Sequence, residues 1–372
     1  MFLYVFIIIN NLKYAFMKKL NLGVIAFGVA IFTSCGGSKV VIDTAAPEEQ
    51  GLNIQKITDE NSNTVLGSRT ASVSGKKSGG LLGAFYGSIV PNASNFALTA
   101  RGGCRDAKYY WGTNRLLTVS PDGAEIAYLN RSNKQDNIMI RRAATQGAST
   151  QRTFRDIGDM SWGSDGNLYF SDCTDGEHSQ IGSTNAKSGS IIRQMTNNNI
   201  DSNPILSKDG KLLLFTRIDK SGPSVWSLNL EDNTLTSCAR GYNPCFTGTS
   251  NDEFICVRNS TAGVSKIWKV DYVKGQETLI LSDKKRGFTN PSVSPDGQWI
   301  LVQGNSKSSV KKNENLDIFA VKIDGSSFTQ ITYHAATDCC PVWSVDGQYI
   351  YFISTRGNKD ESYNVWRMRF AL

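Results

Sequence analysis

Histidine is scarce in this protein of 372 residues, which holds only His178 and His334. The cysteines form no Cys-x-x-Cys pair, so the usual ligand spacing of a zinc site is missing. The Gly-x-Ser-x-Gly elbow that carries the nucleophile of α/β-hydrolases is also absent. We therefore expect neither a metal nor any other cofactor, and we interpret the two histidines as surface or packing residues.

A dense basic segment is missing as well. Lys and Arg number 40 against 33 Asp and Glu, which gives a formal net charge of +7. Part of this excess lies near the start, at Lys13, Lys18 and Lys19. The remaining runs, such as Lys284-Lys285-Arg286, are short and are typical of solvated loops. No nucleic-acid partner is expected.

Apolar runs are short, and the two near the start, Phe2–Ile9 and Leu20–Phe32, each fall below the roughly 20 residues of a membrane-spanning helix. The second run follows Lys18-Lys19 and precedes Thr-Ser-Cys35, which is the order of an export signal. It resembles a bacterial lipoprotein signal, and this implies that Cys35 is acylated and becomes the new N-terminus. An uncleaved membrane anchor is the alternative.

This resemblance sets the expected organisation of the N-terminal part. We expect a signal region at residues 1–35, with the true start at Met17, and a linker at residues 36–52. The mature protein is then expected to be held in the cell envelope by its lipid anchor, on the outer membrane and facing the periplasm.

Eight cysteines are present, so seven remain once Cys35 is assigned to the anchor. An odd number cannot all pair within the protein. Export places these residues where disulfides persist, and one or two bridges are expected. Packing of thiols inside strands is the alternative for the others, and the sequence does not say which cysteines pair.

One sequence motif recurs six times in the C-terminal two thirds of the sequence: a short apolar strand, a Ser/Asp-Gly turn and a second apolar or aromatic strand. Asp122 and Asp165 in the first two turns lie 43 residues apart, and Asp165 and Asp209 lie 44 apart. A period in the forties with several short strands per unit is typical of a β-propeller. The copies are Leu117–Tyr128, Met160–Phe170, Pro204–Phe215, a degraded copy Pro244–Val257, Pro291–Val302 and Pro341–Phe352.

The repeats predict an all-β fold, a six-bladed propeller over residues 114–372. The last blade supplies three strands, so a fourth is needed to leave no open edge. Residues 53–58 read like the fourth strands of other blades and are predicted to close the ring. The Gly/Ser-rich residues 59–113 are interpreted as an insertion or a cap. Asp-Gly suits the tight turn after each first strand, so the repeated aspartates are interpreted as turn formers.

The repeated motif Pro-x-Trp/Val-Ser-x-Asp-Gly-x-x-Ile/Leu-x-Phe/Tyr resembles the WD-like repeat of the TolB family. It is also similar to the propeller domains attached to prolyl oligopeptidase-type peptidases. The resemblance covers about residues 114–372. It is specific for the fold and weak for the function, because such propellers serve many roles.

Two hypotheses of function follow. The first is a non-catalytic envelope lipoprotein whose TolB-like propeller binds a protein or another envelope partner. The alternative is a catalytic propeller, a hydrolase or lyase acting on polysaccharide, because paired carboxylates across a channel cannot be recognised from one sequence. The oligomeric state stays open.

The repeats also predict where a partner binds. Asn precedes the proline of the innermost strand in three copies, and Cys340 or Asp159 occupies the matching place in two others. These residues are expected to ring one mouth of the central channel, where amides offer donors and acceptors to a ligand. The alternative is that Asn before Pro is a turn starter that satisfies its own backbone. The predicted binding residues are Asp159, Asn203, Asn243, Asn290 and Cys340.

Overall fold

The computed structural model describes residues 45–58, 115–132, 135–144, 148–152, 157–174, 179–189, 192–197, 200–219, 221–260, 264–284, 286–306, 315–357 and 363–372. All described residues belong to one compact unit. Several predictions lie outside the described residues: the signal region with Cys35, residues 36–44 of the linker, the insertion at 59–113, and His178.

The described residues form six antiparallel sheets of four strands each. The first three blades are β2 (Leu117–Val119), β3 (Glu125–Ser132), β4 (Gln135–Arg142) and β5 (Thr150–Gln151); β6 (Ile157–Trp162), β7 (Asn167–Asp172), β8 (Gln180–Asn185) and β9 (Ile192–Gln194); and β10 (Asp201–Leu206), β11 (Leu212–Asp219), β12 (Gly222–Asn229) and β13 (Leu235–Arg240).

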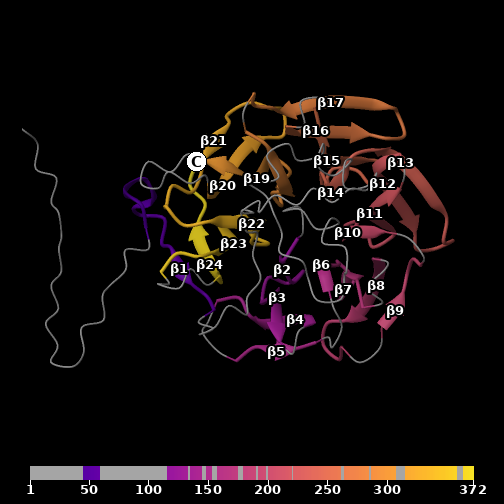
Figure 1. Cartoon of the computed structure of the whole chain (residues 1–372), viewed down its shortest axis with the longest axis horizontal. Coiled ribbons are helices and arrows are strands. Elements are labelled where there is room, and N and C mark those ends of the chain that lie inside the picture. Colours follow the sequence, from indigo (N-terminus) through magenta and orange to yellow (C-terminus); the bar gives the residue numbers. More distant parts are fainter. Residues whose placement is uncertain are drawn as a thin grey trace, which may run out of the picture. The chain divides into compact units, whose positions relative to one another are not determined.

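The other three blades complete a ring. They are β14 (Tyr242–Phe246), β15 (Glu253–Asn259), β16 (Ser265–Asp271) and β17 (Gln276–Leu281); β18 (Phe288–Val293), β19 (Trp299–Ser306), β20 (Asn315–Lys322) and β21 (Thr329–Gln330); and β22 (Asp338–Trp343), β23 (Tyr349–Ser354) and β24 (Asn364–Arg369) with β1 (Gln55–Lys56). Each innermost strand contacts the innermost strands of both neighbouring blades, and β22 contacts β2 (Figure 1). The predicted six-bladed β-propeller is confirmed.

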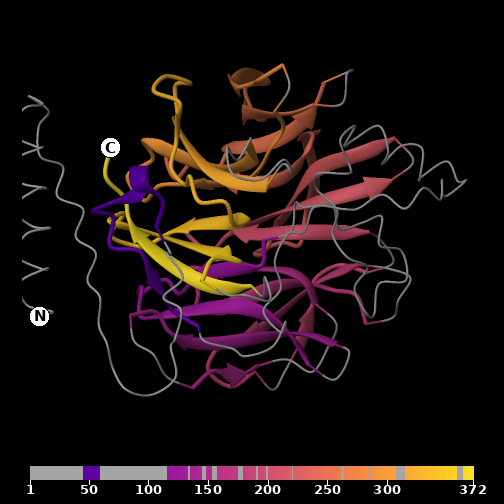
Figure 2. The same ribbon diagram turned by 60° about the vertical axis from the view of Figure 1, so that its left-hand side comes forward.

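The N-terminal segment closes the last blade, as predicted. Strand β1 pairs with β24, so the sheet order is β1-β24-β23-β22, and Figure 2 shows the N-terminal segment in indigo alongside the yellow β24. The paired strand is shorter than residues 53–58, but the pairing continues through side chains. The Thr58 hydroxyl donates to Asn364 Oδ1 at 2.7 Å and accepts from the Val365 N–H at 2.8 Å.

A buried ion cluster fixes the residues that precede this strand. Glu49 ends the 3₁₀-helix η1 (Pro47–Glu49), and its carboxylate accepts from the Arg356 guanidinium at 2.9 and 3.1 Å. The same guanidinium donates to Asp338 at the start of β22, and all three side chains are fully buried. The Tyr333 N–H donates to Glu49 at 2.7 Å. Glu49 therefore ties the N-terminal segment to the last blade.

The Ser/Asp-Gly turns explain the repeated aspartates. In the third blade the Ser207 hydroxyl donates to Asp209 Oδ1 at 2.7 Å, and the same oxygen accepts from the Lys211 N–H at 3.1 Å. Gly210 has a φ of +76°, which glycine adopts at little cost. The same contacts recur at Asp122, Asp296 and Asp346. The prediction that these aspartates form turns is confirmed.

The last residue of each copy of the repeat packs in the core. These side chains stand at equivalent places on the second strands and are fully buried: Tyr128, Phe170, Phe215, Val257, Val302 and Phe352. Cys173 takes part in a disulfide, in line with the expectation for an exported protein. Cys238, Cys245, Cys256, Cys339 and Cys340 carry thiols.

Candidate functional site

The innermost strands of blades two to six each carry a β-bulge at the predicted binding positions. Four of these residues have a positive φ near 50°: Asn203, Asn243, Asn290 and Cys340. Asn adopts this region more readily than most residues because its short polar side chain bonds locally. The Asn-Pro pairs of the sequence therefore mark bulges.

The side chains at these bulges join neighbouring blades. The Asn203 N–H donates to both carboxylate oxygens of Asp159 at 3.1 and 3.0 Å, and Asn203 Nδ2 donates to Asp159 Oδ2 at 3.1 Å. The next contact runs through Thr216, whose hydroxyl donates to Asn203 Oδ1 at 3.1 Å and accepts from the Asn243 N–H at 2.9 Å. Blades two, three and four are connected in this way.

The series continues to the last blade. Asn243 Oδ1 accepts from the Asn290 N–H at 2.7 Å. Gln303 Oε1 then accepts from Asn290 Nδ2 at 3.0 Å and from the Cys340 N–H at 2.8 Å. We call this series of contacts the inter-blade belt. Its five bulge side chains are at most 6% exposed.

The structure thus brings the five predicted site residues to equivalent places, one per blade, but it buries them between the blades. A bulge leaves a backbone N–H without its ladder partner, and in blades three to six a side chain of the preceding blade accepts it. The sequence did not predict this role in joining the blades, because its alternative was an Asn that satisfies its own backbone. Their role in binding a partner stays a prediction.

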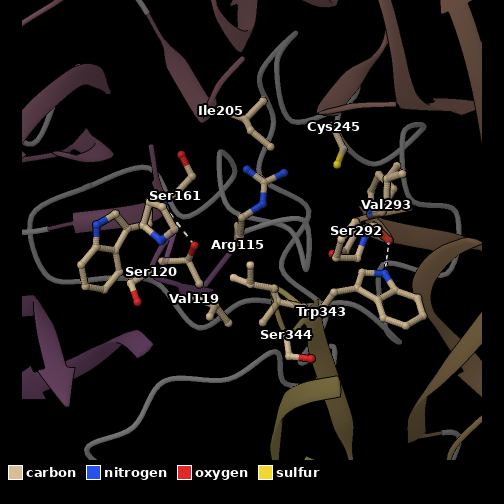
Figure 3. A pocket seen from close by; sticks show the side chains of 17 residues that line it. Arg115, Val119, Ser120, Ser161, Ile205, Cys245, Ser292, Val293, Trp343 and Ser344 are labelled. Atoms are coloured by element: carbon tan, nitrogen blue, oxygen red, sulfur yellow. Dashed lines mark hydrogen bonds between the residues drawn. The ribbon is translucent and has the colours of Figure 1, made fainter. Parts of the chain in front are cut away.

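A cavity of about 320 Å³ lies at the end of the channel near the first turns of blades one, five and six (Figure 3). Its wall includes an equivalent residue from each blade, and in blades two to six this residue lies two positions after the bulge residue. Side chains alternate along a strand, so this is the next position that faces the axis. The six residues are Thr118, Ser161, Ile205, Cys245, Ser292 and Val342.

Arg115 is the one charged residue among those that line the cavity. It precedes β2 in the first blade and reaches toward blades three and four (Figure 3). Its guanidinium donates to the carbonyl of Pro204 at 3.1 Å and to that of Pro244 at 3.0 Å. The cavity therefore combines a fixed positive charge with hydroxyl and apolar walls.

Two buried titratable groups border Arg115. Burial raises the pKa of Asp159 to about 6, although hydrogen bonds from Asn203 and Ser171 and the Arg115 charge act in the opposite direction. Burial also raises the pKa of the Cys245 thiol. This thiol is a weak nucleophile at neutral pH because the thiolate is the reactive form.

The aromatic residues of the cavity are held in place. Trp343 Nε1 donates to the Ser292 carbonyl at 2.9 Å, which joins the sixth blade to the fifth. The backbone N–H of Trp162 donates to Thr118 Oγ1 at 3.1 Å and joins the second blade to the first. These two bonds therefore connect neighbouring blades at the wall of the cavity.

The repeated blades around this cavity match a known family. The family model described as TolB beta propeller domain matches residues 114–310, more than half of the protein. The protein belongs to the TolB β-propeller family. The solved structures that resemble it include that assigned to TolB from Agrobacterium tumefaciens, with a TM-score of 0.51 and 16% identity over 71% of this protein and 93% of that one.

Two further relatives show how far the likeness extends. TolB from Acinetobacter baumannii has a TM-score of 0.51 and 15% identity over 66% of this protein and 64% of that one. An uncharacterised protein of Agrobacterium fabrum is 32% identical over 91 residues, 24% of this protein. The matched part spans 29% of the length of that curated relative. At these identities the solved structures establish the fold of the TolB-type propeller and do not identify its partner.

Within the described ranges of the TolB-type propeller, no group of three or more His, Cys, Asp or Glu could hold a metal ion. His334 accepts from the Ala336 N–H through Nδ1 at 3.0 Å. None of the helices in the described part is long and apolar enough to cross a membrane.

Sequence reasoning missed Arg115 and the six wall residues. Arg115 stands just before the first repeat and has no counterpart in the other copies, so repetition gave no signal for it. The wall positions were missed because, in blades two to six, the bulge changes which side chains of the innermost strand face the channel. The proline itself was the usable signal, since the wall residue follows it directly in blades three to six.

Proposed function

We propose that this protein is a cell-envelope lipoprotein whose TolB-type propeller binds a protein partner at the cavity around Arg115 and catalyses no reaction. The observation that carries the proposal is the composition of the cavity. Arg115 and Cys245 are the titratable residues of the lining. The lining therefore lacks the pair of carboxylates that a glycosidase uses. Fixed apolar walls with a few polar groups are typical of binding sites.

The envelope location rests on the sequence. Residues 17–35 carry the export signal, and acylation of Cys35 would hold the propeller at a membrane. The resemblance to the periplasmic TolB agrees with this location. The outer membrane, facing the periplasm, is the proposed site.

Site-specific photo-crosslinking in the native envelope tests the proposed function. A benzoylphenylalanine in place of Val345, a turn residue of the sixth blade that lines the cavity, should crosslink to one protein partner. The control position is Leu279 on the outermost strand β17, which has a similar exposed fraction of 42% against 47% for Val345. The adduct should appear for Val345 alone and disappear with Arg115→Gln.

Equal adducts at both positions would place the partner elsewhere. Turnover of an envelope polysaccharide by the purified protein, lost with Arg115→Gln, would replace the binder with the catalytic alternative.

A further inference from the structure

We infer that the channel cavity binds a carboxylate of the partner's polypeptide, held by the Arg115 guanidinium and the Ser161 hydroxyl. The inference rests on the proposed function, since it names the group that occupies the proposed site. Both residues line the same cavity and come from neighbouring blades (Figure 3).

The first observation concerns Ser161. The residue is only 3% exposed, and its Oγ makes no hydrogen bond to the residues that the structure describes. A buried hydroxyl without a partner is unfavourable, and the great majority of buried polar groups in proteins are paired. Ser161 is one of the residues that line the cavity, and under this inference a ligand atom there supplies the missing partner.

The second observation concerns the donors of Arg115. A guanidinium carries five N–H groups, and the bonds to the Pro204 and Pro244 carbonyls use two of them. Those bonds fix the plane of the group, so that little side-chain freedom is lost when a ligand binds. Charge-assisted bonds from Arg to a carboxylate are stronger than those between neutral groups.

The charge of the cavity selects the kind of anion. Arg115 supplies the single formal charge of the lining, which matches the single charge of a carboxylate. A phosphate group carries more negative charge and is usually met by several cations or backbone N–H groups. The donors present, one guanidinium and one hydroxyl, also suit the two oxygens of a carboxylate.

The size and walls of the cavity favour the end or a short segment of a polypeptide. Its volume of about 320 Å³ lies at the lower limit of ligand sites. Val119, Ile205 and Val342 line it beside Trp343, so an aliphatic side chain next to the carboxylate has an apolar surface to contact. The C-terminus of a polypeptide and an Asp or Glu side chain both present this chemistry.

Calorimetric titration of the purified mature protein with three peptides tests the inference. The probes are acetyl-Ala-Leu-Leu with a free C-terminal carboxylate, the same peptide as a C-terminal amide, and acetyl-Ala-Leu-Glu amide. The free acid or the Glu peptide should bind at least tenfold more tightly than the uncharged amide. Preference for the free acid identifies a C-terminus, and preference for the Glu peptide identifies an acidic side chain.

Variants assign the effect to the two residues. Ser161→Ala should reduce the preference for the carboxylate several-fold, and Arg115→Gln should abolish it. Ser164→Ala is the matched control, because its hydroxyl lies in an exposed turn and donates to the Ser207 carbonyl. Ser161→Ala removes an unpaired hydroxyl, so its melting temperature should stay at or above that of the parent.

Equal binding of the acid and amide peptides would overturn the carboxylate inference and leave the binding function standing. Failure of all three peptides, in a protein whose Val345 position still crosslinks to a partner, would also overturn it. Failure of both experiments would overturn the proposed function as well.

Discussion

Asp159 is the residue whose ionisation links the inter-blade belt to the cavity. Its carboxyl is fully buried, accepts from Asn203 of the next blade and is influenced by the Arg115 charge. Burial disfavours the carboxylate and raises its pKa to about 6, so the folded protein keeps this proton well above the usual range of an aspartic acid.

Replacing Asp159 by Asn should flatten part of the pH dependence of stability. Between about pH 4 and pH 6 the folded protein holds a proton that the unfolded protein has lost, so this group lowers stability as the pH rises through that window. The difference between about 6 and the usual 3.8 corresponds to about 3 kcal/mol at most.

Denaturant unfolding of the parent and of Asp159→Asn at pH 4, 5, 6 and 7 measures the effect. The stability of the variant relative to the parent should rise with pH over this range, even if lost hydrogen bonds lower it by a constant amount. A difference that does not change with pH would show that Asp159 does not titrate there.

At the scale of strands and turns, the sequence predicted what local chemistry dictates. The Asp-Gly turns, the number of blades and the closing strand followed from repeated residue types. The wall of the channel did not follow from them. The β-bulges, where Asn203, Asn243 and Asn290 have a positive φ, insert one residue into the strand. The side chains after the bulge therefore do not point where simple alternation predicts. That shift depends on backbone conformation, which a pattern of residue types does not display.

The contact of Glu49 with Arg356 could not be predicted for a different reason. The two residues lie 307 positions apart. Nothing in the local sequence marks Glu49 as buried, since it neighbours the exposed Glu48 in a short polar segment. Only closure of the ring brings the two residues together.

Glu49→Gln should therefore destabilise the propeller through its closing segment. Removing one charge from a buried ion cluster typically costs about 3 to 5 kcal/mol, because the partner charge stays buried. Arg356 keeps Asp338, so the lower part of this range is expected. Glu48→Gln is the control and should leave the melting temperature unchanged. Equal melting temperatures of the two variants would mean that β1 pairs with β24 without help from Glu49.

At the scale of the whole molecule, the ring is chemically uneven although its blades are alike. The inter-blade belt runs from the second blade to the sixth through buried side chains. In the first blade the described residues of β2 and β3 pair without a bulge, and Arg115 reaches the carbonyls of blades three and four instead. The first blade thus supplies the charge at the axis, and all six blades contribute to the surrounding wall.

The lipid anchor is the prediction that concerns the protein as a whole. Each CH₂ of an acyl group that is buried in the bilayer adds about 0.8 kcal/mol to membrane binding, and stable anchoring takes two acyl groups or a second signal. With a mildly basic propeller, the acyl groups on Cys35 should supply most of this binding.

Cys35→Ala should move the protein from the membrane fraction to the soluble fraction and abolish fatty-acid labelling. Cys238→Ala is the control, because its half-buried thiol belongs to the folded blades, and it should keep both properties. Membrane partitioning of Cys35→Ala equal to that of the parent would contradict the anchor.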